Sequence, residues 1–197
     1  MNKNLPLSNI VVLDLTNVLS GPFATQILSD LGAEIIKVEK PNGDDSRKFG
    51  PFIKKRSSYF ISLNRGKKSI VVDFNNEEDK KIFKKLLAIS DVIIDNFKPG
   101  TLEKYGFSSS YLKKNFPLLI QTKISGFGET GPLKENPAYD MIVQAMGGIM
   151  SITGKDKNET YRVGSSIGDI VAGLYAVIGV LTQIIFRNQS KKGSRLD

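Results

Sequence analysis

The fold is decided by residues 10–38, IVVLDLTNVLSGPFATQILSDLGAEIIKV. The first six residues, apolar except for Asp14, are rich in β-branched side chains, which predicts a strand. Ser20 and Pro22 predict the start of a helix that continues to about Leu31, and Gly32 ends it. Residues 35–38 predict a second strand. This strand–helix–strand unit predicts two parallel strands joined by a right-handed crossover.

The same alternation continues along the chain. Further strands are predicted over residues 70–73, 91–95 and 118–124, and helices over residues 76–87 and 108–115. Alternation on this scale predicts an α/β fold with a Rossmann-like, doubly wound and mostly parallel sheet.

The pattern changes after residue 124. We expect a Gly/Pro loop, a helix over residues 139–146, a polar turn region over residues 154–158 and a long, buried apolar helix after Asp169. Residues 191–197 resemble a turn that opens a further element. We therefore expect this chain to be incomplete at its C-terminus.

The composition limits the chemistry that is possible. The chain has 197 residues, of which 40% are hydrophobic and 24% charged, as expected for one folded domain. Cysteine and histidine are absent, which excludes disulfides, thiolate nucleophiles, Cys/His zinc sites and imidazole bases. Any reaction must use carboxylates, hydroxyls, lysines or backbone dipoles.

The charge and the apolar segments bear on partners and location. The net charge of +8 makes nucleic acid, anionic membranes and phosphorylated ligands candidates. Lysine pairs such as Lys80-Lys81 favour solvated helix faces instead. Polar residues in the first fifteen positions argue against a secretory signal, so we expect a cytoplasmic protein. The strictly apolar run at residues 170–181 is shorter than the roughly 20 residues of a membrane span, so we expect no membrane.

Residues 126–131 match the dinucleotide-binding pattern G-x-G-x-x-G and follow a predicted strand. That pattern needs its glycines at the start of a helix, where the N-terminus meets a pyrophosphate. Here Pro132 and Pro137 bracket a short polar segment without helical spacing. The context therefore disfavours NAD or FAD.

Asp169 is the candidate catalytic carboxylate. It follows Gly168 and precedes the apolar helix, a position typical of a helix N-cap. The alternative is a nucleophile, because an ionised aspartate can attack an activated acyl carbon without a base. Two loops at strand ends, residues 64–69 and 96–100, are equally open to an anion contact or to ordinary solvation.

Together these segments resemble the class III CoA-transferases, the CaiB/BaiF family, over nearly the whole chain. The resemblance is carried by residues 12–15, Gly21-Pro22, residues 28–41, Gly43-Asp44-Asp45 with Arg47, residues 64–69, 96–100, 125–132 and 137–148, and Gly168-Asp169. It implies a transfer of CoA from an acyl-CoA donor to a carboxylic acid through an aspartyl mixed anhydride and an aspartyl-CoA thioester, with Asp169 as the nucleophile.

The resemblance also assigns the other site residues. It implies coenzyme A contacts at Val18, Lys40, Lys67, Asn96, Phe97 and Lys98, a substrate pocket at Leu19, Tyr139 and Asp140, and no metal. The related α-methylacyl-CoA racemases have a catalytic histidine where this chain has Tyr139, which favours a transferase over a racemase.

The family members are longer, so the resemblance implies that residues 1–197 are the N-terminal part of the CoA-binding and catalytic large domain. The small domain, the C-terminal return segment and the interlocked homodimer expected of the full-length protein would then require chain beyond this fragment. The expected partners are an acyl-CoA and a small carboxylic acid, without nucleic acid. A racemase-like enzyme, a non-catalytic CoA- or nucleotide-binding module and a basic nucleic-acid binder remain as alternatives.

Overall fold

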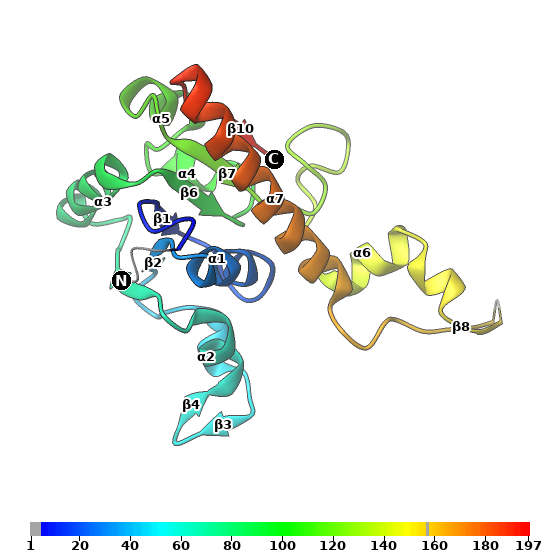
Figure 1. The fold of residues 1–197 in the computed structure, drawn as a ribbon. Coiled ribbons are helices and arrows are strands. Elements are labelled where there is room, and N and C mark those ends of the chain that lie inside the picture. Colours follow the sequence, from blue (N-terminus) through cyan, green and yellow to red (C-terminus); the bar gives the residue numbers. More distant parts are fainter. Residues whose placement is uncertain (1–4, 157) are drawn as a thin grey trace.

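A computed structural model describes residues 5–156 and 158–197. Within them, the main sheet has the strand order β10-β7-β6-β1-β2-β5, and all paired neighbours are parallel (Figure 1). The strands are β1 (Val11–Asp14), β2 (Glu34–Glu39), β5 (Lys68–Val71), β6 (Val92–Asp95), β7 (Ile120–Lys123) and β10 (Arg195–Leu196). The doubly wound parallel sheet is confirmed, with its reversal of strand order between β1 and β6.

Two helices, α1 (Ser20–Asp30) and α7 (Ile167–Ser190), cover one face of the sheet. Their apolar side chains join the inward-facing strand residues in one core cluster that includes Val12, Leu28 and Val180, all fully buried. The helices approach closely because α7 carries Gly173, where a Cβ would lie 2.7 Å from the Ser20 carbonyl oxygen. This packing fixes the start of α7 beside the start of α1.

The other face is covered by α3 (Glu77–Ile89), α4 (Thr101–Lys104) and α5 (Ser109–Asn115). Phe83 and Phe107 meet edge to face with their ring centroids 4.8 Å apart, and both are buried. Asn76 and Ser108 cap α3 and α5 through side-chain hydrogen bonds. The predicted helices 76–87 and 108–115 are therefore present, each starting one residue after its cap.

Two segments project from the sheet (Figure 1). One contains η1 (Asp45–Lys48), the hairpin β3 (Phe52–Ile53) and β4 (Arg56–Ser57), and α2 (Ser58–Asn64). The other contains α6 (Asp140–Met146), η2 (Ile149–Ile152) and the hairpin β8 (Gly154–Asp156) and β9 (Glu159–Thr160). The sequence predicted α6 but neither hairpin nor α2.

The prediction of a buried apolar helix after Asp169 is wrong about its start and only partly right about its burial. Helix α7 begins at Ile167, so Asp169 lies in its first turn. One side of α7 packs on the sheet and α1, but Tyr175, Ile178 and Ile185 on the other side are 57–70% exposed. By length and composition α7 also qualifies as a membrane span, although its inner side belongs to the core. A helix lying on a sheet buries only the side that faces it.

Candidate active site

Two loops meet where the strand order reverses. Asn17 follows β1 and Asn96 follows β6, the two neighbouring strands from which the chain runs outward in opposite directions. The Asn17 N–H donates to Asn96 Oδ1, and Asn96 Nδ2 donates to the Asn17 carbonyl, each over 2.9 Å. Ligands of open α/β sheets bind at this point. Asn96, a predicted CoA contact, thus holds the backbone of the loop between β1 and α1.

The same loop contains a strained residue. Val18 has a φ of 67°, a conformation that costs a β-branched residue on the order of 1–3 kcal/mol. Its N–H donates to Asp44 Oδ1 over 3.3 Å. Leu19 follows at the N-cap of α1 without a side-chain cap hydrogen bond, so Ser20 is the first helical residue and not the cap. The predicted contact residues Val18 and Leu19 therefore lie in a loop whose shape is imposed by its surroundings.

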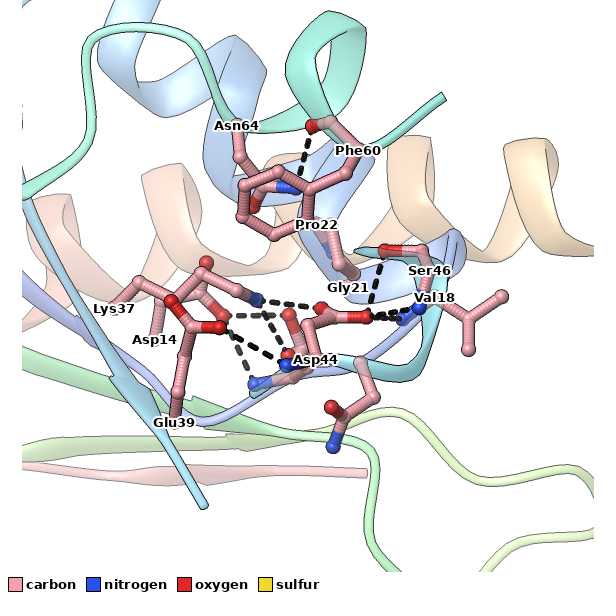
Figure 2. A network of polar contacts seen from close by, with 12 residues as sticks. Asp14, Val18, Gly21, Pro22, Lys37, Glu39, Asp44, Ser46, Phe60 and Asn64 are labelled. Atoms are coloured by element: carbon pink, nitrogen blue, oxygen red, sulfur yellow. Dashed lines mark hydrogen bonds and ion pairs between the residues drawn. The ribbon is translucent and has the colours of Figure 1, made fainter. Parts of the chain in front are cut away.

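Four buried charges lie beside this loop, and Figure 2 labels three of them, Asp14, Lys37 and Asp44. Lys37 Nζ is 2.9 Å from Asp44 Oδ2, and Lys67 Nζ is 3.1 Å from Asp14 Oδ2, with all four side chains at most 1% exposed. Burial alone would raise the pKa of Asp14, but the ammonium groups of Lys37 and Lys67 outweigh it and hold that pKa well below its usual range. Two cations and two anions thus compensate one another inside the fold.

The ammonium of Lys67 contacts only protein acceptors among the described residues. Besides Asp14, its ammonium donates to the Pro22 carbonyl (3.0 Å), Thr25 Oγ1 (2.7 Å) and Asn64 Oδ1 (2.9 Å). Burial lowers the pKa of Lys67, and the attraction of Asp14 only partly opposes this. Lys67 thereby ties β1, α1 and α2 together. Its contact with CoA stays a prediction, since in this structure its donors face protein acceptors.

A third ion pair extends the charged cluster toward the surface. Arg47 binds both carboxylate oxygens of Glu39 at 2.7 Å, and its guanidinium lies 3.8 Å from the centre of the Phe60 ring. Burial opposes ionisation of Glu39, but the hydrogen bonds from Arg47 and Ser69 lower its pKa to about 2. Glu39 also accepts the Asp44 N–H, so it fixes the segment that carries Asp44.

Asp169 lies at the third residue of α7, half buried. Ser166 occupies the N-cap position, so the interpretation of Asp169 as the cap is wrong. Within the described part of the chain, its carboxylate has no hydrogen bond or ion pair. Burial, and then the negative charge of Asp140, raise the pKa of Asp169. An unpartnered, more basic carboxylate is a suitable nucleophile.

Asp140 holds the start of α7 in place. Its Oδ1 accepts the Gly168 N–H over 2.8 Å, and its Oδ2 accepts from Gln144 Nε2 over 2.7 Å. A Cβ at Gly168 would lie 3.1 Å from that same Oδ1, so a glycine permits this contact. Tyr139, at the N-cap of α6, is 78% exposed. The structure thus brings Asp140 and Asp169 together, with Tyr139 open to solvent.

Tyr59 is a site residue that the sequence analysis missed. Burial raises its pKa, and the charges of Asp169 and Asp44 add to the effect, so its phenol lies within electrostatic reach of both carboxylates. Its ring meets Phe49 edge to face at 5.7 Å. The sequence signal for its position was Ser57, which caps α2 by accepting the Phe60 N–H. A serine cap at this position predicts a helix that contains Tyr59.

The remaining predicted CoA contacts lie nearer the surface. Lys40 is half exposed and pairs with Asp45 at 2.8 Å. Lys98 is exposed, and Phe97 packs partly against the core under α3 and α5. Among the described residues, no group of three or more acidic side chains is placed to hold a metal ion.

Comparison with known proteins places this arrangement in context. The model of CoA-transferase family III matches residues 7–197. An acetyl-CoA:oxalate CoA-transferase of Acetobacter aceti is 45% identical over 194 residues, which are 98% of this chain and 50% of that protein. A human succinyl-CoA:glutarate CoA-transferase is 41% identical over 199 residues, covering 100% of this chain and 45% of that protein.

A solved structure from the matched family has the same fold. A CaiB/BaiF family protein from Brucella suis superposes with a TM-score of 0.95 at 44% identity, over 99% of this chain and 53% of that one. The chain spans about half the length of the curated relatives it matches.

Proposed function

Because this chain belongs to CoA-transferase family III, we propose that it acts in the transfer of CoA from an acyl-CoA to a small carboxylic acid, with Asp169 as the nucleophile. The observation that carries this proposal is the Asp169 carboxylate, half buried at the start of α7, beside Asp140 and without a partner in the described structure. A raised pKa makes the ionised carboxylate a stronger nucleophile, provided that the pH stays above that pKa.

The proposed reaction balances without a base. An Asp169 oxygen attacks the thioester carbonyl carbon, the C–S bond breaks, and CoA leaves as a thiolate, which yields a mixed anhydride. The thiolate then attacks the Asp169 carbonyl carbon and displaces the donor carboxylate, which leaves an aspartyl-CoA thioester. The acceptor carboxylate attacks that carbonyl carbon and displaces the thiolate, which yields a second mixed anhydride. The thiolate then attacks the acceptor carbonyl carbon of this anhydride, which forms the acceptor acyl-CoA and releases the Asp169 carboxylate. Each step exchanges one acyl bond for another.

The surroundings of the site support CoA as the ligand. CoA carries phosphates that favour cations. Lys98 is exposed on the segment that follows β6, and Lys40, half exposed and paired with Asp45, lies on the segment that follows β2. The loop of Val18 and Leu19 lies between them at the reversal of strand order. The acceptors named for relatives include oxalate, glutarate and mesaconate, all dicarboxylates. We extend this class to the present chain.

The test is covalent trapping. The chain is incubated with acetyl-CoA or succinyl-CoA, and its intact mass and the modified peptide are measured. We expect an adduct on Asp169 that Asp169→Ala abolishes and that Asp156→Asn, which alters an exposed hairpin carboxylate, leaves unchanged. Adduct formation should fall as the pH drops through the raised pKa of Asp169. Asp140→Asn removes a neighbouring negative charge and should move that fall to lower pH.

A second candidate is a CoA-binding module without turnover, because the exposed Lys98 and the loop of Val18 and Leu19 would serve CoA binding whether or not a reaction follows. Tight CoA binding with no adduct from either thioester would support it over the transferase. An adduct on another residue would contradict both the nucleophile and this module.

A further inference from the structure

The proposed chemistry makes no use of the buried Lys37–Asp44 pair, although this pair contacts the strained loop. Three consecutive loop residues are held from three directions. Lys37 on β2 donates to the Thr16 carbonyl over 2.7 Å, Asn96 brackets the Asn17 peptide groups, and Asp44 accepts the Val18 N–H. A positive φ at a β-branched residue persists only where the surroundings enforce it.

Asp44 is built for this task. Its Oδ1 accepts from the Val18 N–H at 3.3 Å, the Ser46 N–H at 2.8 Å and the Ser46 hydroxyl at 2.6 Å, and Lys37 Nζ lies 2.9 Å from its Oδ2 (Figure 2). Burial would raise the pKa of Asp44, but Lys37 and the Ser46 hydrogen bonds lower it, so the carboxylate stays ionised at neutral pH. The charge that holds Val18 is thus itself held by a buried cation.

We propose that Asp44 is a positioning residue for CoA binding: paired with Lys37, it holds the Val18 backbone in its strained conformation and so presents the β1–α1 loop to the ligand. This inference rests on the proposed function, because it assumes that CoA meets this loop. Asp44 itself is 1% exposed and is not assigned a contact with the ligand.

The chain offers a matched control. Asp91 also pairs with a cation, Arg187 at 2.9 Å, and also accepts a backbone N–H of the β1 region, that of Val11 at 2.8 Å. It lies just before β6, at the opposite end of the sheet from Asn96. Asp44→Asn and Asp91→Asn therefore each remove one charge from a carboxylate that pairs with a cation and accepts a backbone N–H, but Asp91, whose side chain is 26% exposed, does not contact the Val18 loop.

Two measurements are made on the chain: the Kd for free CoA by calorimetry, and amide hydrogen exchange without ligand. For Asp44→Asn we expect the Kd to rise about tenfold or more and exchange to quicken at residues 16–19, as expected when a mutation displaces a binding loop. For Asp91→Asn we expect a change in Kd of no more than about twofold. In the Val18→Gly background, where glycine adopts positive φ freely, Asp44→Asn should cost much less affinity.

Several outcomes would overturn the proposal. Equal losses of CoA affinity in Asp44→Asn and Asp91→Asn would mean that the loss is not specific to Asp44. Unchanged exchange at residues 16–19 in Asp44→Asn would mean that Asp44 does not hold the loop. If Asp44→Asn does not fold, Ser46→Ala takes its place. We expect it to raise the Kd by a smaller factor and to quicken exchange at residues 16–19. An unaltered Kd in Ser46→Ala overturns the proposal. Absence of CoA binding by the unaltered chain overturns the proposed function instead, and exchange alone then decides whether Asp44 holds the loop.

Discussion

A substitution of Lys67 can tell whether this residue stabilises the fold or contacts CoA. Its ammonium lies 3.1 Å from the buried Asp14 carboxylate and is 1% exposed. Lys67→Met would leave that buried carboxylate without its ion-pair partner, with only Lys37 to compensate it, so we expect the free energy of unfolding to fall by about 3–5 kcal/mol. Lys68→Met is the matched control, because its neighbouring ammonium is 68% exposed and pairs with Glu34 at the surface. Urea unfolding followed by circular dichroism measures both.

The exposed Lys68–Glu34 ion pair should contribute less than about 1 kcal/mol to the free energy of unfolding, as surface ion pairs do. If Lys67→Met kept its stability and lost CoA affinity, the ammonium would reach the ligand directly, as the family resemblance implies. Loss of stability with little change in affinity among the molecules that remain folded would make Lys67 a structural residue.

At the scale of elements, the contact between α1 and α7 carries a prediction. A Cβ at Gly173 would lie 2.7 Å from the Ser20 carbonyl oxygen and 3.0 Å from the Phe23 ring. Gly173→Ala should therefore lower the free energy of unfolding by about 1–3 kcal/mol, despite the better helix propensity of alanine. Because Asp169 lies one turn earlier on α7, adduct formation should slow as well.

Gly179→Ala is the control within the same helix. The three atoms nearest to its Cβ would all belong to the side chain of Leu196, whose far end can move, while the gain in helix propensity is the same. Equal effects of the two substitutions would show that close backbone packing at Gly173 does not determine the position of α7.

The elements also show which features local sequence predicts. Caps and apolar periodicity placed α1, α3 and α5 to within about two residues, because those signals act within one turn. The strand predicted over residues 70–73 is β5, Lys68–Val71, shifted because its ends follow its register with β2. The start of α7 before Asp169 depends on the Asp140 contact with Gly168, 28 residues apart.

The same distinction applies to the candidate site. Asp169 could be found from the chemistry of a chain without histidine and from the resemblance of its surroundings. Tyr59 and Asp44 could not, because their importance depends on how separate segments are arranged: the charge of Asp169 helps to raise the pKa of Tyr59, and Asp44 holds Val18. Side chains brought together by the tertiary fold leave no periodic pattern in the sequence.

At the scale of the whole molecule, apolar surface is distributed unevenly. The sheet is covered on both faces, yet the outer side of α7 and much of α6 are exposed. Large exposed apolar patches of this kind mark interaction surfaces. The chain spans about half the length of the relatives it matches, and within the described residues this apolar surface is available for association.

This surface makes a prediction about the isolated chain. Tyr175, Ile178 and Ile185 on α7 are 70%, 57% and 61% exposed, and Met141 and Met146 on α6 are 57% and 60% exposed. We therefore expect the 197-residue chain to bind a hydrophobic dye under native conditions and to associate as its concentration rises, measured by fluorescence and light scattering. A variant combining Ile178→Glu and Ile185→Lys should reduce both signals without lowering helical content, because neither side chain belongs to the core. A monomeric, dye-negative chain with a sharp cooperative melt would instead mean that these helices rearrange to bury their own apolar faces.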